Sequence, residues 1–148
     1  MNSIINSLKS MRFLEKLLIA LTLISFLSKL IFAYQATIDL FLCSVFLSIL
    51  YFPLGFYFLG KIPSQNVFFK SILLGGLYSI SIVLFLLGNF SRDGFLLFQI
   101  FDILVLSIVL FVFFIKMRRA FNEYYMLQVL RSSFFIILNI IVLILNII

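Results

Sequence analysis

The chain consists of long apolar runs separated by short polar stretches. Five such runs can be marked, covering residues 13–34, 40–60, 71–91, 95–115 and 132–148. A helix needs about 20 apolar residues to cross roughly 30 Å of hydrocarbon, because each residue rises about 1.5 Å. The pattern predicts an all-α polytopic membrane bundle with five transmembrane helices. Because the last run has only 17 residues, four spans plus a C-terminal membrane-embedded helix is the alternative.

The polar stretches between the runs are short, with one exception. Stretches such as SRDG at 91–94 leave room only for tight turns, so consecutive helices should be antiparallel neighbours in a single membrane domain covering 1–148. The exception is 116–131. Its basic and apolar residues fall on opposite sides of a helix, which predicts an amphipathic connector on the cytoplasmic membrane surface. Arg118 and Arg119 would contact the headgroups, and docking of a cytoplasmic partner is the alternative.

The basic residues are unequally divided between the two ends of the predicted helices. Nine of them fall on one side: Lys9, Arg12, Lys16, Lys61, Lys70, Lys116, Arg118, Arg119 and Arg131. Only Arg92 flanks the other side. Basic residues are retained in cytoplasmic loops, so the N-terminus should be cytoplasmic. With five spans the C-terminus is then outside, in the inner membrane of a bacterium.

Composition agrees with a membrane location and excludes several other classes of protein. The 148 residues are 65% hydrophobic and 11% charged, with a mean hydropathy of +1.31, whereas about a quarter of the residues in soluble domains are charged. The net charge of +6 does not indicate nucleic-acid binding, because no polar domain is present to carry a basic patch. The lipid bilayer is the first expected partner.

The reactive residue types argue against an enzyme. The chain has no histidine, which excludes histidine-ligated haem and metal sites and histidine acid–base catalysis. Its one cysteine, Cys43, lies in an apolar run and is read as a packing residue. No glycine-rich phosphate loop and no nucleophile with a neighbouring base are found in the sequence. We therefore expect no catalytic site, cofactor or metal.

Two charged residues, Lys29 and Asp102, nevertheless lie several residues inside the outer ends of predicted spans. Lys29 is five residues inside Tyr34, or roughly 7–8 Å, and Asp102 is seven residues into its run, or roughly 10 Å. A lysine stem can extend to the headgroups, which is the simplest interpretation of Lys29. However, Lys29 shares a polar arc with Thr22, Ser25 and Ser28, and such an arc favours a side that faces protein.

The two charges are predicted to form a pair. An aspartate has a short side chain, and leaving it ionised in hydrocarbon costs several kcal/mol. The topology places Lys29 at a similar depth in the same leaflet, and Gln99 lies one turn before Asp102. Lys29 and Asp102 with Gln99 are therefore a candidate polar set, with Asp39 as the competing partner of Lys29. The pair would fix the register of two helices or belong to an ion or proton path.

Other spacings predict where helices pack. Ser71, Gly75 and Ser79 repeat every fourth residue, which allows another helix to approach closely. Ser132, Asn139 and Asn146 repeat every seventh residue and so share one side of the last helix. Pro53 should kink the second helix near residues 49–53, because proline removes a backbone donor.

These features together lead to a functional expectation. The two predicted packing stripes and the lack of a catalytic constellation favour a non-catalytic structural or accessory subunit of a membrane protein complex. Its partners would be other membrane protein subunits or further copies of the chain. The alternative is a small oligomeric transporter or channel whose polar path includes Lys29, Gln99 and Asp102.

Overall fold

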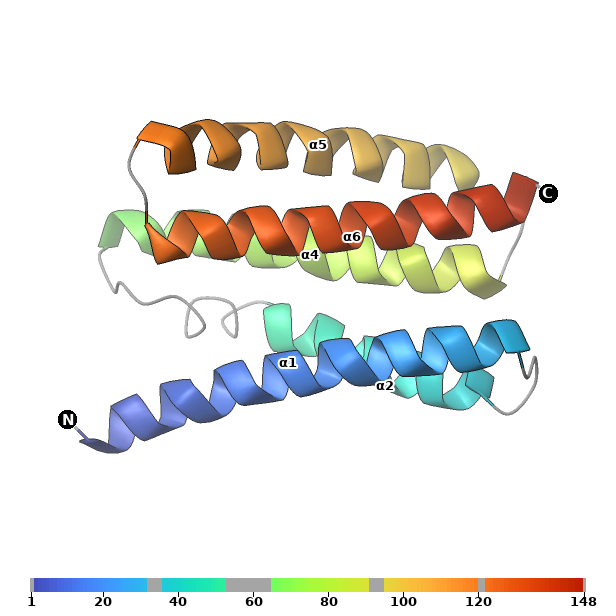
Figure 1. The fold of residues 1–148 in the computed structure, drawn as a ribbon, viewed down its shortest axis with the longest axis horizontal. Coiled ribbons are helices and arrows are strands. Elements are labelled where there is room, and N and C mark those ends of the chain that lie inside the picture. The colour runs from blue at the N-terminus through green and yellow to red at the C-terminus, as the bar shows by residue number, and fades with distance from the viewer. Residues whose placement is uncertain (1, 32–35, 53–64, 91–94, 120–121, 148) are drawn as a thin grey trace. The chain divides into compact units, whose positions relative to one another are not determined.

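The computed structural model describes residues 2–31, 36–52, 65–90, 95–119 and 122–147, and almost all of them are helical. Within these residues there are five helices, shown in Figure 1: α1 (Asn2–Ile31), α2 (Ala36–Tyr51), α4 (Gln65–Phe90), α5 (Leu96–Arg119) and α6 (Glu123–Ile147). No strand occurs among the described residues. The all-α prediction is confirmed for this part of the chain.

Three of the helices in the described part are long and apolar enough to cross a membrane. They are Phe69–Phe90 in α4, Leu96–Arg119 in α5 and Glu123–Asn146 in α6. The apolar stretch of α2, Thr37–Tyr51, is shorter. These helices fit a membrane protein with transmembrane helices, whereas the count of five spans stays a prediction. The predicted kink at Pro53 lies outside the described residues.

The region 116–131 differs from the prediction, because it is not a separate helix. Residues 116–119 form the last turn of α5, and α6 begins at Glu123. The Asn122 side chain accepts a hydrogen bond from the Tyr124 backbone N–H at 3.0 Å, which satisfies a donor in the first turn of α6. Glu123 places a negative charge in the first turn of α6, and basic residues lie in the last turn of α5. Each charge is favourable at that end of its helix dipole.

This boundary also changes the length of the last helix. The apolar run 132–148 is extended towards the N-terminus by residues 123–131, which continue the helix without a proline or glycine. The candidate span in α6 therefore has 24 residues, Glu123–Asn146, which is about 36 Å at 1.5 Å per residue. The shortness of the run was the reason for the four-span alternative, and the structure removes that reason.

The chain divides into two compact units, Met1–Ile80 and Ser81–Ile148, and the division falls within α4. In the first unit α1 packs against α2. Its core contains Leu18, Phe26, Leu40, Leu47, Tyr51 and Tyr78, all buried. The rings of Tyr51 and Tyr78 are 5.9 Å apart.

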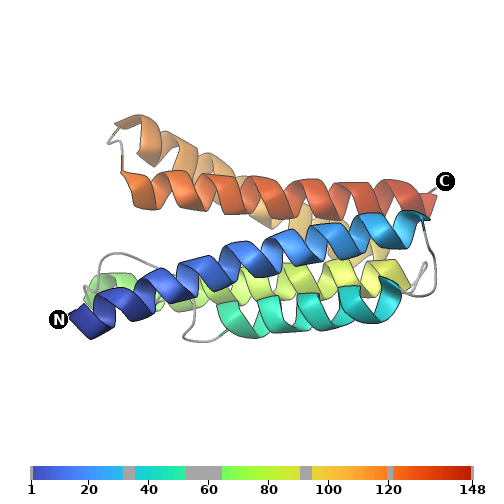
Figure 2. The same ribbon diagram turned by 60° about the horizontal axis from the view of Figure 1, so that its bottom comes forward.

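The second unit contains α5, α6 and residues 81–90 of α4. Helices α5 and α6 pack against each other, and Figure 2 shows α5 crossing α6 at an angle. The buried apolar residues of this unit are Ile82, Phe85, Leu86, Leu106, Phe135, Leu138 and Val142. The opposite side of α5 is apolar and exposed, with Leu97 80% and Phe101 67% accessible. A large exposed apolar side of this kind suits lipid and not water.

Candidate functional site

Buried polar side chains gather inside the second unit. Ser81 comes from α4, Gln99 and Asp102 from α5, and Asn139 from α6, and all four are buried. Apolar side chains such as Leu106 and Phe135 are buried in the same unit. Because hydrocarbon offers no hydrogen bonds, polar groups at this position must find partners within the protein.

Three of these residues form a direct hydrogen-bonded cluster. The Ser81 hydroxyl donates to Asp102 Oδ2 at 2.7 Å. Asn139 Nδ2 lies 3.0 Å from Ser81 Oγ and 3.5 Å from Asp102 Oδ2. The same amide nitrogen also donates to the Phe135 carbonyl, one turn earlier in α6, at 3.1 Å. The cluster therefore connects three helices through one carboxylate.

Two further polar contacts lie next to this cluster along the same helices. Gln99 Nε2 donates to the Leu84 carbonyl of α4 at 3.2 Å. Asn146 Nδ2 donates to the Gly88 carbonyl at 2.9 Å. Ser81 and Gly88, like Asn139 and Asn146, are seven residues apart, which is nearly two helical turns. Polar contacts consequently recur along one side of each helix.

Gly88 provides the space for Gln99. A Cβ atom built on Gly88 would overlap the Gln99 amide nitrogen and would lie 2.7 Å from its Cδ and 3.0 Å from Val142 Cγ1. A side chain at this position would force the Gln99 amide to move, so the glycine leaves the space that the amide occupies. The glycine therefore positions the amide beside the backbone of α4.

Two buried oxygens of the site have no hydrogen-bond partner among the described residues. They are Gln99 Oε1 and Asn139 Oδ1. Both belong to amides whose nitrogens do donate, to the Leu84 and Phe135 carbonyls respectively. Buried acceptors without a donor are rare in proteins and call for an explanation. The site has more acceptors than donors.

The first unit has polar contacts of its own. The Tyr51 hydroxyl donates to Glu15 Oε1 at 2.8 Å, and both side chains are buried. The hydroxyls of Ser48 and Ser79 lie 2.6 Å apart, linking α2 to α4. These contacts show how the helices of this unit are held together by polar groups at specific positions.

The predicted residues are distributed over both units. Lys29 is half-buried in α1, in the unit Met1–Ile80, whereas Asp102 and Gln99 belong to the other unit. Their pairing stays a prediction. Ser71, Gly75 and Ser79 are buried in the first unit, and Ser132 and Asn139 in the second. Asn139 and Asn146 bond to α4 of the same chain.

Some residues of the site carried no clear signal in the sequence. Serine is common in apolar helices, so nothing singled out Ser81 as the residue that contacts Asp102. Gly88 has no repeat of small residues around it. Glu15 does carry a signal, because an acidic residue inside the apolar run 13–34 needs a partner, and the Tyr51 hydroxyl donates to it.

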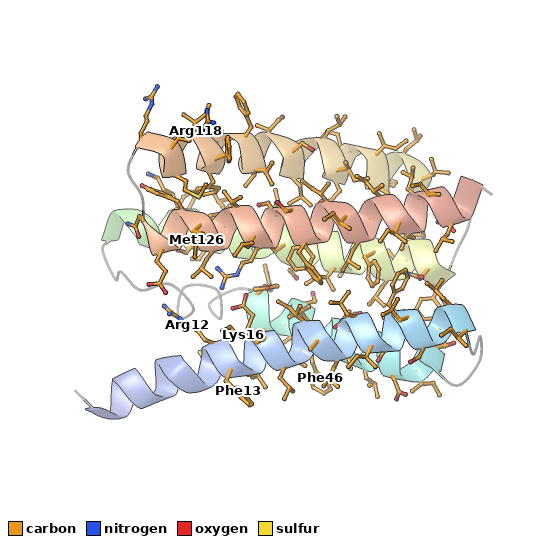
Figure 3. All side chains as sticks on the ribbon, viewed as in Figure 1. Arg12, Phe13, Lys16, Phe46, Arg118 and Met126 are labelled. Carbon is orange, nitrogen blue, oxygen red and sulfur yellow. The ribbon has the colours of Figure 1, made fainter. Side chains whose placement is uncertain are left out.

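Basic and aromatic residues lie together where α5 ends and α6 begins. Arg118 and Arg119 are exposed at the end of α5, and Figure 3 shows Arg118 near this end. The Arg118 guanidinium lies 5.2 Å from the Phe114 ring centroid. The Phe113 ring contacts both Tyr124 and Tyr125. Tyrosine and arginine are the residue types that favour the headgroup region.

Comparison with known proteins gives no assignment of the site. No protein-family model, no curated protein and no solved structure matches the chain. Among the residues that the structure describes, no three His, Cys, Asp or Glu side chains lie close enough to hold a metal ion.

Proposed function

We propose that the chain is a bacterial inner-membrane protein with five spans and a cytoplasmic N-terminus. The three long apolar helices support the membrane location. Eight basic residues on one side of the predicted topology support the orientation. The ninth, Arg131, lies inside the candidate span of α6 and does not count towards it. The cluster of Arg118, Arg119 and tyrosine rings at the α5–α6 end is consistent with a cytoplasmic headgroup region.

Within the membrane, the proposed role is that of a non-catalytic structural or accessory subunit of a protein complex. The observation that carries this proposal is that the polar side chains of the second unit bond to one another across helices. Such contacts hold helices in register, as expected of a packing element. A catalytic site would instead direct several polar groups towards a substrate.

The contacts of α6 also indicate where a partner would bind. The side of α6 that carries Asn139 and Asn146 already faces α4 of the same chain. A membrane partner would therefore contact an exposed apolar side. The side of α5 that carries Leu97, Phe101 and Leu104 is one such surface.

The test is purification of the full chain from its native membrane in a mild detergent, followed by native mass spectrometry. We expect a stoichiometric complex with a different membrane protein. If only the single chain or its homo-oligomer is found, the subunit role is wrong. The control for adventitious capture is an unrelated membrane protein that carries the same tag and is purified in the same way.

A second candidate is a small oligomeric transporter or channel with a polar path through Lys29 and Asp102. It is favoured by one observation, the buried Asp102 carboxylate next to amide groups of Gln99 and Asn139 whose oxygens lack partners among the described residues. Intramembrane carboxylates often belong to ion or proton paths. Reconstituted vesicles carrying the Asp102→Asn variant should then lose ion flux. Equal flux in the wild type and the variant would exclude this path.

A further inference from the structure

The cluster around Asp102 lacks hydrogen-bond donors. An ionised carboxylate accepts but does not donate, and a serine hydroxyl supplies one donor and a primary amide two. Asn139 Nδ2 has four acceptor atoms within 3.5 Å: Ser81 O, Ser81 Oγ, Asp102 Oδ2 and Phe135 O. Its two hydrogens cannot serve all four. Asn139 Oδ1 meanwhile has no donor among the described residues.

The cluster also lacks a neighbouring positive charge within the described part of its own unit. The α4 portion, 81–90, has no charged residue, and Asp102 is the only one in 96–115 of α5. On α5 the next charge is Lys116, fourteen residues on and about 21 Å away along the helix. On α6, Arg131 is eight residues before Asn139, or about 12 Å, and Glu123 is farther. Of the described residues in this unit, Ser81 and Asn139 hydrogen-bond to the Asp102 carboxyl group, and both are uncharged.

We propose that Asp102 holds a proton, so that Ser81, Asp102 and Asn139 form an intramembrane proton-binding site. A proton on the carboxylate adds one donor to the cluster, which Ser81 Oγ accepts, and it removes a charge that is costly to bury in a membrane. The proton comes from water and bonds to a carboxylate oxygen, and no bond in the protein breaks. The Ser81 hydroxyl, which donates to the ionised carboxylate, rotates and accepts from the acid.

The geometry favours a proton over a metal cation. The Ser81 Oγ to Asp102 Oδ2 distance of 2.7 Å is that of an ordinary hydrogen bond between two oxygens. A bound proton needs no additional space there. A hard cation would need several oxygen ligands around a common centre, whereas Asn139 directs its amide nitrogen towards Asp102 and Ser81.

This inference goes beyond the role of a subunit and does not depend on it. A packing element needs only that the polar groups of Asp102 and Asn139 be satisfied. A proton-binding site in addition changes its hydrogen bonds when the proton leaves, because Ser81 must then donate to Asp102 again. The hydrogen bonds that join α4, α5 and α6 would therefore change when the proton binds or leaves.

The test is infrared spectroscopy of the full chain in lipid bilayers, with the aspartate side-chain carboxyl carbon labelled with ¹³C. The chain has three aspartates, Asp39, Asp93 and Asp102, so the label restricts the signal to these groups. We expect a carbonyl stretching band of a protonated carboxyl group at neutral pH, shifted by the label. Comparison of the labelled chain with the unlabelled one measures this isotope shift, so this step needs no substitution.

Variants show which aspartate gives the carbonyl band. It should be lost in Asp102→Asn and retained in the matched control Asp39→Asn. In Ser81→Ala the band should shift in frequency, because the hydroxyl contact of 2.7 Å is removed. A band that persists unchanged in Asp102→Asn would overturn the assignment to Asp102.

Two other results would contradict the proposal. If the wild type shows no protonated band and one appears only when sodium is removed, the site binds a metal cation. If the wild type shows no such band and Lys29→Met creates one, Lys29 neutralises Asp102 as an ion pair.

Discussion

At the scale of single residues, one glycine contacts two of the polar side chains of the second unit. Gly88 leaves the space that the Gln99 amide occupies, and its carbonyl accepts the Asn146 amide. At Gly76, in the same helix, a Cβ would meet no described atom within 4 Å apart from its chain neighbours and the adjacent backbone of its own helix. The two glycines therefore have different roles, although both lie inside α4.

Gly88→Ala should lower the free energy of unfolding by about 1–3 kcal/mol, the usual cost of overpacking a core. The added methyl group displaces the Gln99 amide from its place beside α4. Gly76→Ala is the matched control and should be neutral or stabilising by less than about 1 kcal/mol, because alanine favours a helix over glycine. Denaturation of the reconstituted chain in SDS measures both variants. Equal effects of the two substitutions would show that Gly88 is not tightly packed.

Sequence spacing predicted part of this site and not the rest. The interval between Asn139 and Asn146 predicts that both lie on one side of a helix, because seven residues are nearly two turns, and both amides bond to α4. The spacing could not reveal that this side faces α4, since any helix with free acceptors would satisfy an amide. The contact of Ser81 with Asp102 depends on the relative rotation of two helices, which side-chain packing determines.

At the scale of elements, polar contacts also hold α1 and α2 together. Tyr51 is fully buried at the end of α2, and its hydroxyl donates to the Glu15 carboxylate of α1. A hydrogen bond to a buried carboxylate contributes more than one between neutral groups. The contact thus fixes the register of the two helices at one point.

Tyr51→Phe should lower the free energy of unfolding by about 1–2 kcal/mol, because Glu15 loses a buried donor while the ring is retained. Glu15→Gln tests the same contact from the other side and should cost less, since an amide oxygen still accepts from Tyr51. Both are measured by SDS denaturation. A Tyr51→Phe variant as stable as the wild type would show that this hydrogen bond does not hold α1 to α2.

The boundary of α6 shows where hydropathy alone misleads at this scale. The stretch 123–131 contains Glu123, Gln128 and Arg131, so its polarity suggested a connector. The structure instead buries Gln128 and Arg131 in the helix. A helix continues where backbone bonding is uninterrupted, and polar residues can be included if they face protein.

At the scale of the whole molecule, the proposed topology has testable consequences. Cys43 is the single native cysteine, so a Cys43→Ser background allows cysteines to be placed one at a time. We expect Asn122→Cys to react with a membrane-impermeant maleimide only from the cytoplasmic side, and Ser91→Cys only from outside. Reaction of both positions from the same side would rule out the one predicted span between them, 95–115.

The relation between Lys29 and Asp102 is a second question at this scale. If Asp102 holds a proton, Lys29→Met and Asp102→Asn should act independently on the free energy of unfolding. Their effects should add to within about 0.5 kcal/mol in a double-mutant cycle. A larger coupling would favour the ion pair that the sequence predicts and would contradict the proton on Asp102.

The position of the site within the chain has a consequence for biosynthesis. Asp102 lies on α5, and its partner Asn139 is 37 residues later, on α6. Because α6 follows α5 along the chain, Ser81 of α4 can bond to Asp102 before Asn139 of α6 reaches it. The three-helix cluster is therefore complete only once α6 has joined α4 and α5. If the ribosome stalls before α6 emerges, Gln99 and Asp102 lack the helix that completes their surroundings. We expect such a truncated chain to be a substrate for membrane quality control.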